Sequence, residues 1–406
     1  MKWRLILVVL LTINNNCKAQ LLTLDSFYFD GATAYKRLQS TQKLQQQYIA
    51  TLYTKPVDSI TSSQWQKAFW AIGFMGDTRP ATIKLLQAAC KKFTTLSPYT
   101  QLKLLENIYA LATVNFTNEV QLLIPKLASL KQALIVQAYL KKYKMQPKNM
   151  AQTILNFAKT DTALYAAYQY NLTAKNVTAK ALKNLLSNNT VLNYTLIISL
   201  QPSSRNTEGI AIIKQANGQL LTAQNGKTFS SPQLARAVNN MPWYISNGNT
   251  PQGIFAINGL AVSDNSYIGK TPNLQLVMPG EVLAFEFFKL SDSTYINYNN
   301  ADFYTKFPFL TTNSALWQTY YAAKAGRTEI IAHGTTVNPE YYKGAAFYPN
   351  TPTLGCLSST ELYDLKTGKC IKSNQLALVN AFNSFSSIEA YLVVIEADQS
   401  IINAYK

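Results

Sequence analysis

The hydrophobic periodicity of the chain changes near its middle, and this change constrains the fold more than any other feature. Between about residues 23 and 193, apolar residues recur every three or four positions, as in residues 65–74, which is typical of helices. From about Leu196 onward, short apolar runs alternate with clusters of Gly, Pro and Asn, which is typical of strands. The sequence therefore predicts an α+β fold, with an all-α domain over residues 20–200 and a mainly β domain over residues 205–400.

The length of 406 residues also favours two domains, because a single hydrophobic core seldom grows beyond about 250–300 residues. Within the helical half, residues 71–86 resemble a HEAT-type helical repeat, with Gly76 and Asp77 at the turn between two paired helices. Residues 112–127 resemble a degenerate second copy. A helical-repeat domain and an irregular helical bundle both fit this pattern.

The second half carries the signals of a mainly β domain with a few helices. Ala216-Asn-Gly between two apolar runs indicates a hairpin. Helices are expected over residues 231–239 and 313–325, with another after Thr360, and the linker between the domains is expected at residues 203–207. The expected strands cover residues 210–214, 219–221, 254–257, 274–277, 283–288, 329–332 and 391–395.

The N-terminus has the pattern of a secretory signal peptide over residues 1–19. A basic start is followed by a short apolar run over residues 5–11 and by small residues near Cys17 and Ala19. Cleavage is expected after Ala19, and a lipoprotein signal at Cys17 is the minor alternative. The apolar run is too short to span a bilayer, and no later segment is apolar enough. We therefore expect a periplasmic or secreted protein with no transmembrane span.

Basic residues outnumber acidic ones, which gives the full chain a formal net charge of +17. Loss of Lys2, Arg4 and Lys18 with the signal peptide leaves +14. In a cytosolic protein this excess would suggest nucleic acid as a partner. Outside the cytoplasm the polyanion would be cell wall or a membrane surface. The basic residues are scattered, so a solvated lysine-rich surface is favoured, and no nucleic-acid partner is expected.

Removal of the signal peptide leaves three of the four cysteines, namely Cys90, Cys356 and Cys370. An odd number in an exported chain leaves at least one thiol unpaired unless a partner chain supplies another. A disulfide between Cys90 and Cys370 is one arrangement that fits. The count suits one free, reactive cysteine.

His333 is the only histidine in the chain, and this excludes several kinds of site. A His-rich zinc site and an H-E-x-x-H motif cannot be built, and no dinucleotide-binding or phosphate-binding glycine motif occurs. We therefore expect no metal and no cofactor. Taken alone, a single histidine is more often structural, and a single cysteine is more often a small buried apolar group.

His333 and Cys356 nevertheless occupy positions that suit catalysis. His333 ends an apolar strand and enters a polar loop that contains Gly334, where functional sites concentrate. Cys356 precedes the helix expected after Thr360, so a helix dipole and free backbone N–H groups would stabilise its thiolate and an oxyanion. Histidine can serve as general base and then general acid near neutral pH.

Three segments resemble the L,D-transpeptidase family, whose catalytic domain is of the YkuD type. Residues 331–335 (Ile-Ala-His-Gly-Thr) and 353–357 (Thr-Leu-Gly-Cys-Leu) resemble its His-Gly-Thr strand and its Ser/Thr-x-Gly-Cys loop. Residues 249–257 (Asn-Thr-Pro-Gln-Gly-Ile-Phe-Ala-Ile) resemble the strand that precedes the site in this family. The resemblance covers about residues 208–398 and implies a YkuD-like L,D-transpeptidase catalytic domain after the helical domain.

The resemblance implies a role for each site residue. Cys356 would attack the carbonyl of the third residue of a peptidoglycan stem peptide and release the terminal D-residue. His333 would activate the thiol and later an amine, while the backbone carbonyl of Gly334 orients the imidazole. Thr353 would shape the loop. The N–H groups implied for the oxyanion hole belong to Leu354, Gly355 and Cys356.

Two features depart from the family pattern. Many members have Arg or Asn two residues after the cysteine, and this chain has Ser358. The loop between His333 and Cys356 is longer than in short members, and its residues 341–348 are rich in aromatic side chains. This stretch fits a lid or substrate platform as well as a loop packed on its own rings. Trp243 and Tyr244 are expected to pack in the core rather than line a cleft.

The resulting hypothesis is an exported cysteine acyltransferase that forms L,D cross-links between stem peptides through a thioester on Cys356. An L,D-carboxypeptidase or cross-link hydrolase on the same fold is a second hypothesis, because both routes share one acyl-enzyme. A non-catalytic wall-binding scaffold with a degenerate site is a third, motivated by Ser358. Peptidoglycan stem peptides are the expected partners, and the helical domain would bind a wall-anchored or other protein.

Overall fold

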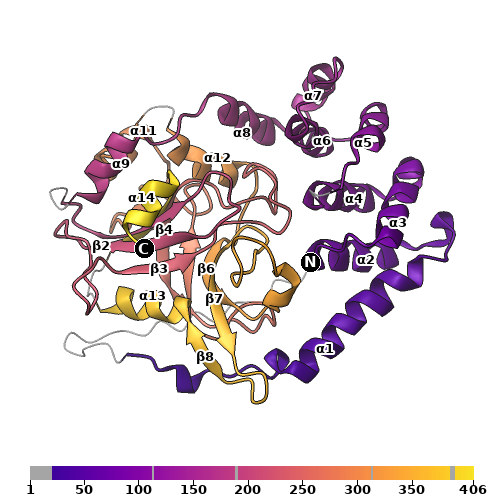
Figure 1. Ribbon diagram of the computed structural model, residues 1–406. Coiled ribbons are helices and arrows are strands. Elements are labelled where there is room, and N and C mark those ends of the chain that lie inside the picture. The colour runs from indigo at the N-terminus through magenta and orange to yellow at the C-terminus, as the bar shows by residue number, and fades with distance from the viewer. Residues whose placement is uncertain (1–20, 112–113, 188–190, 312–313, 385–388) are drawn as a thin grey trace.

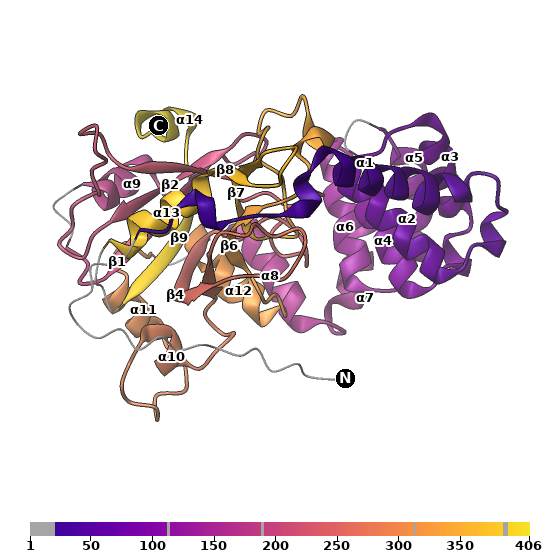
Figure 2. The same cartoon turned by 90° about the horizontal axis from the view of Figure 1, so that it is seen from below.

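The computed structural model describes residues 21–111, 114–187, 191–311, 314–384 and 389–406. Helices gather on one side of the molecule and a large sheet with its own helices on the other (Figure 1). The view from below shows the same division (Figure 2). The α+β class is therefore confirmed. The expected signal peptide lies outside the described residues, as do residues 112 and 113 of the expected second repeat.

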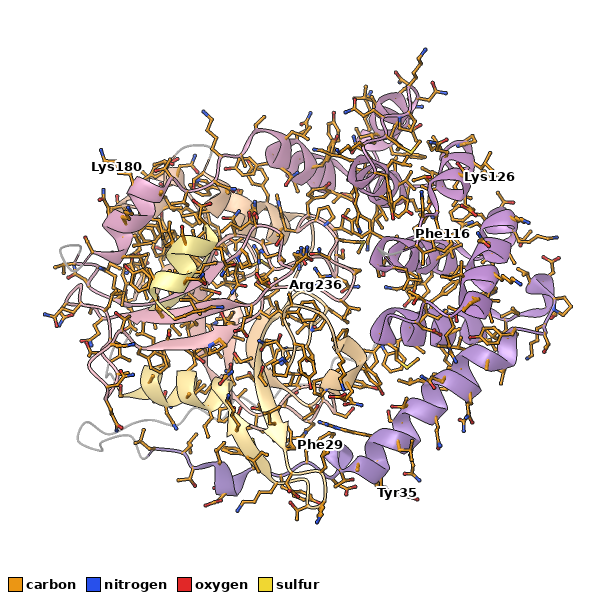
Figure 3. The ribbon with its side chains drawn as sticks, viewed as in Figure 1. Phe29, Tyr35, Phe116, Lys126, Lys180 and Arg236 are labelled. Carbon is orange, nitrogen blue, oxygen red and sulfur yellow. The ribbon has the colours of Figure 1, made fainter. Side chains whose placement is uncertain are left out.

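The helical region is built from consecutive helices that pack in two rows. Helix α2 packs on α4 and α4 packs on α6, while α3 packs on α5. Their shared core contains large buried rings such as Trp65 and Phe69, together with Phe116, which is labelled in Figure 3. The helices of this region are α1 (Ala34–Gln42, continued by a π-helical segment over Lys43–Ile49), α2 (Ser62–Met75), α3 (Pro80–Lys91), α4 (Pro98–Ala110), α5 (Thr117–Leu123), α6 (Leu130–Lys142), α7 (Met150–Ala158) and α8 (Thr162–Thr173). Helix α9 (Ala179–Leu186) lies beside the sheet instead, and its three buried leucines belong to the core of the sheet region (Figure 1).

The turn expected at Gly76 and Asp77 joins α2 to α3. Gly76 adopts the left-handed conformation (φ 61°) that ends a helix at glycine with little strain. The buried Asp77 carboxylate accepts hydrogen bonds from the backbone and side chain of Arg79 and from Thr82 Oγ1. These bonds fix the entry into α3, so the predicted turn is confirmed.

The second region is organised by a nine-stranded sheet in the order β3-β2-β1-β9-β4-β5-β6-β7-β8. Two neighbouring pairs are parallel, β1 with β9 and β6 with β7, and the other pairs are antiparallel. The strands are β1 (Thr195–Gln201), β2 (Gly209–Lys214), β3 (Ser230–Gln233), β4 (Gly253–Ala261), β5 (Asn273–Val277), β6 (Ile331–Thr335), β7 (Leu357–Tyr363), β8 (Cys370–Ser373) and β9 (Ala390–Glu396).

The sheet curves until the residue after β3 reaches β7. Leu234 and Ser358 exchange two backbone hydrogen bonds, with N···O distances of 2.8 and 2.9 Å. Helix α13 (Asn374–Asn383) packs against β3, β6 and β7. The remaining helices are α10 (Ala284–Phe288), α11 (Asn300–Lys306), α12 (Gln318–Lys324) and α14 (Gln399–Ala404). None of the helices in the described part of the chain is long and apolar enough to cross a membrane.

Two expected elements have the opposite secondary structure. The helix expected over residues 231–239 is wrong, because this segment begins in β3 and then pairs with β7 and the loop before it through Leu234 and Ala237. The strand expected over residues 283–288 is helix α10, whose buried Ala284, Phe287 and Phe288 follow helical spacing. In both segments the tertiary structure overrides the local sequence pattern. Sheet pairing makes residues 231–239 extended, and burial of one face makes residues 283–288 helical.

Two further expectations fail around the β domain. The helix expected to start near Ser359 and Thr360 does not form, since both residues lie inside β7, and the next helix along the chain is α13. The linker expected at residues 203–207 joins β1 to β2, which are antiparallel neighbours in one sheet, so this segment is a turn. The helix expected over residues 313–325 is confirmed by a 3-10 turn (Ala315–Trp317) and α12.

The first described residues pack on the β region before the chain enters the helices. The Phe29 N–H donates to the Gly368 carbonyl, and the Phe29 ring meets Tyr363 edge-on at 6.3 Å (Figure 3). Cys370 lies buried beneath this segment, and Cys90 is buried in α3. Both are free thiols, so the disulfide considered between them does not form.

We expect Asp77→Ala to lower the free energy of unfolding by about 2 kcal/mol, because the buried Thr82 hydroxyl and the part-buried Arg79 donors lose their shared carboxylate. Urea denaturation of residues 20–406 measures this loss. Asp58→Ala is the matched control, since Asp58 forms an exposed ion pair with Lys92, and it should cost less than about 0.5 kcal/mol. Equal losses for the two variants would contradict the proposed role of the Asp77 turn.

Candidate active site

The parallel pair β6–β7 positions both residues of the expected catalytic pair. His333 is the central residue of β6 and pairs with Ser358 in the strand register. Cys356 immediately precedes the first residue of β7. Both side chains line one pocket of about 490 Å³. Because parallel neighbours bring equivalent ends to the same edge of a sheet, residues 23 positions apart in sequence share one site.

The His333 ring is buried and held by its own strand. Its Nδ1 lies 2.6 Å from the carbonyl oxygen of Gly334. A carbonyl only accepts hydrogen bonds, so Nδ1 carries the proton and Nε2 keeps its lone pair. The role implied for the Gly334 carbonyl, which is to orient the imidazole, depends on this hydrogen bond. Burial lowers the pKa of His333, and the bond to Gly334 opposes that shift, so the neutral imidazole is favoured.

A glycine is required at position 334 because a carboxyl group packs against it. A Cβ there would lie 2.1 Å from Glu361 Oε1. Glu361 is buried and accepts hydrogen bonds from Thr271, Tyr363 and Ser373. This network supports the strand segment that carries His333.

Cys356 is half-buried, and its thiol contacts the chain that enters β6. Its S–H donates to the Glu329 carbonyl at 3.6 Å, and the Ile331 N–H donates to the sulfur at 3.5 Å. Burial raises the pKa of Cys356, while the Ile331 N–H and the Arg327 cation oppose the rise. The expected stabilisation by a helix dipole is wrong, because Cys356 precedes a strand.

The two side chains share the pocket without a direct hydrogen bond. Within the described residues, the hydrogen bonds of the Cys356 thiol go to Glu329 and Ile331, and the His333 ring bonds Gly334. The pKa shifts of the pair favour a neutral thiol beside a neutral imidazole. Proton transfer from sulfur to Nε2 would then accompany the attack, since catalytic hydrogen bonds often form only once substrate is bound.

The loop before Cys356 is tied by hydroxyl groups. Thr353 Oγ1 donates to the Cys356 carbonyl at 2.8 Å and accepts from the Gly355 N–H at 3.0 Å. Thr250, from the segment before β4, donates to the Gly355 carbonyl at 2.8 Å. The Gly355 N–H is therefore already engaged. Among the described residues, the N–H groups of Leu354 and Cys356 have no acceptor and stay available to an oxyanion.

Ser358 occupies the position where the family pattern usually has Arg or Asn. Its hydroxyl donates to the Thr351 carbonyl at 2.6 Å, while its backbone pairs with Leu234. The side chain is fully buried. Ser358 therefore fastens the loop to the sheet and brings no charge to the pocket.

The Arg327 side chain brings a positive charge to the pocket, and this residue was not among those predicted from the sequence. The guanidinium is buried and donates to the carbonyls of Trp243, Asn249 and Gly248. A Cβ at Gly355 would lie 2.4 Å from its Nη2. Burial lowers the pKa of Arg327 to about 10, and the neighbouring Cys356 opposes the shift. The signal that could have indicated Arg327 is its place in the sequence, after Gly326 in the short segment between α12 and β6, where a charged residue lies beside two buried elements.

The helical region supplies an aromatic wall of the same pocket. Trp70 and Phe74 of α2 stack at 5.2 Å, and both contact Tyr267 of the β region. These rings line the pocket that holds His333 and Cys356. Nothing in the sequence distinguished Trp70 from a core residue of its helix.

The aromatic loop over residues 341–348 bridges the two regions. Tyr341 shares a hydrogen bond with Thr41, and Tyr342 donates to the Phe74 carbonyl at 2.7 Å. The Arg236 cation lies over the Phe347 ring at 5.2 Å (Figure 3). The loop therefore packs against the helical region instead of only on its own rings.

Trp243 and Tyr244 are buried, as expected for packing residues. The Trp243 N–H donates to Asn171 of α8. No group of three or more His, Cys, Asp or Glu side chains that could hold a metal ion occurs in the described ranges.

We expect Arg327→Met to raise the pKa of the Cys356 thiol, because a nearby positive charge is removed. A rise of one unit would slow alkylation by iodoacetamide about tenfold at neutral pH. The pH dependence of the alkylation rate measures it. Arg205→Met is the matched control, because Arg205 is equally buried but pairs with Glu396. Identical pH profiles for wild type and Arg327→Met would contradict the electrostatic role.

Comparisons with protein-family models, curated proteins and solved structures give no match to this chain.

Proposed function

We propose that the protein is an exported cysteine acyltransferase that forms L,D cross-links between peptidoglycan stem peptides. The observation that carries the proposal is the buried His333 ring, held through Nδ1 by the Gly334 carbonyl, in one pocket with Cys356. The resemblance of three sequence segments to L,D-transpeptidases names the substrate class. Thr250 belongs to one of these segments and donates a hydrogen bond to the loop of another, which supports their acting as one site.

In the first half of the reaction, His333 Nε2 takes the proton of the Cys356 thiol as sulfur attacks the carbonyl of the third residue of the stem peptide. The oxyanion meets the N–H groups of Leu354 and Cys356. Collapse of this intermediate breaks the C–N bond to the terminal D-residue, which leaves as an amine after receiving the proton from His333. A thioester on Cys356 remains.

In the second half, an amine of another stem peptide attacks the thioester. Its C–N bond forms as the C–S bond breaks, and His333 takes the amine proton and returns a proton to the sulfur. Water attacking in place of the amine would give a trimmed peptide, which is the carboxypeptidase outcome on the same acyl-enzyme. Arg327 stabilises the negative charge on the sulfur in both halves of the reaction, first as the thiol loses its proton and then as the C–S bond breaks.

The test incubates the mature protein with muropeptides that carry tetrapeptide stems. Wild type should release the D-residue and form peptide dimers. Cys356→Ala should abolish both, and His333→Gln should slow release by about 10²- to 10⁴-fold, the usual contribution of a general base. Product release that persists unchanged in Cys356→Ala would rule the proposal out.

The pH dependence follows from the His333 shift. Its pKa is lowered in the folded protein, so the neutral base persists on the acid side of the ordinary imidazole value of about 6.5. We expect the acid limb of kcat/KM to fall below that pH. An acid limb at or above it, with the enzyme still folded, would contradict a buried neutral base.

A further inference from the structure

A second pocket of about 270 Å³ lies between α2 and α4 and adjoins the pocket of His333 and Cys356. We call it the α2–α4 pocket. It shares Trp70, Phe74 and Leu354 with the first pocket. Leu354 is 63% exposed and immediately precedes Gly355 and Cys356 in the chain. A ligand that fills the α2–α4 pocket therefore ends close to an acyl group on Cys356.

Two residues that line this pocket each have a buried oxygen atom without a hydrogen-bond partner among the described residues. Glu106 and Asn107 of α4 are 7% and 5% exposed and both line the pocket. Glu106 binds Lys103 through Oε2, and Asn107 donates from Nδ2 to the Lys103 carbonyl. Their other oxygens, Glu106 Oε1 and Asn107 Oδ1, accept no hydrogen bond from any described residue. Buried acceptors are rarely left unpaired, so these two oxygens indicate a ligand that donates to them.

The chemistry of the pocket selects the ligand. Lys103 already balances the Glu106 charge, which favours uncharged N–H donors over a free cation. The partly exposed rings of Trp70 and Tyr99 offer apolar surface beside the two oxygens. Amide N–H groups with small apolar side chains, the features of a short peptide, match both.

We propose that the α2–α4 pocket binds the amine-bearing stem peptide that attacks the thioester. This inference rests on the proposed function and extends it. The peptide donates amide N–H groups to Glu106 and Asn107, and its amine reaches across Leu354 to the acyl group. Occupancy of the pocket favours aminolysis of the acyl-enzyme over hydrolysis. The helical region is thereby part of the enzyme's specificity and not only a docking domain.

Three substitutions change the two unpaired oxygens, or cover one of them, in different ways. Glu106→Gln and Asn107→Leu alter the unpaired oxygens. Gly73→Ala places a methyl group 3.1 Å from Asn107 Oδ1 and covers it. Because alanine is favoured over glycine inside a helix, we expect Gly73→Ala to fold like wild type once the Asn107 side chain shifts by a few tenths of an ångström. Glu119→Gln in α5 is the matched control, since Glu119 lies outside both pockets.

The experiment follows one donor tetrapeptide with the full mature chain and records two quantities. Release of the D-residue reports acyl-enzyme formation, and the ratio of dimer to trimmed tripeptide reports its fate. We expect the three variants to keep the release rate within about twofold while the ratio falls roughly 3- to 10-fold, as for a lost hydrogen bond. Glu119→Gln should match wild type. An unchanged ratio in all three variants would overturn the inference.

A binding measurement distinguishes failure of this inference from failure of the proposed function. Amine-bearing tripeptide is titrated into Cys356→Ala protein, with and without Gly73→Ala. We expect Kd to rise roughly 3- to 10-fold with Gly73→Ala. If wild type releases no D-residue yet this difference is found, the transferase proposal fails and the peptide pocket stands. Equal Kd values, or competition by an N-acetylglucosamine oligomer but not by peptide, would overturn the peptide assignment.

Discussion

The parallel pairing of β6 with β7 fixes where His333 and Cys356 lie, and the rest of the site depends on it. Parallel strands need a crossover connection, and here that connection is the loop between residues 336 and 356. Its tyrosines bond to α1 and α2, and its end is fastened by Ser358 and Thr353. The register of one strand pair thus places the thiol, the imidazole and the N–H groups proposed to bind the oxyanion together.

In the proposed mechanism the same arrangement favours the neutral forms of the thiol and the imidazole before substrate binds. Burial raises the pKa of Cys356 and lowers that of His333. Arg327 donates to three backbone carbonyls, and no carboxylate of the described residues is hydrogen-bonded to it. Its charge opposes the rise in the pKa of the neighbouring Cys356. A buried cation stabilises the thiolate only as it forms, which is the condition for lowering a transition state.

The sequence predicted the strands that carry His333 and precede the site, because their apolar runs are bounded by turn residues. It failed at residues 231–239, where a helical spacing of apolar residues was overridden by pairing with β2 and β7. The sequence also predicted a helix near Thr360, where the structure has β7, so the expected helix dipole does not act on Cys356. Arg327 and Trp70 could not be assigned to the site, because their proximity to Cys356 arises from contacts between segments far apart in the chain.

Mass analysis of the intact mature protein after exposure to a carbapenem tests the central claim most directly. A carbapenem presents a strained acyl carbonyl, so one adduct requires the nucleophile, the base and the oxyanion donors together. The account predicts a single covalent adduct that maps to Cys356 and is absent from Cys356→Ala. An unmodified wild-type protein, with the free thiol of Cys356 verified after unfolding, would contradict it.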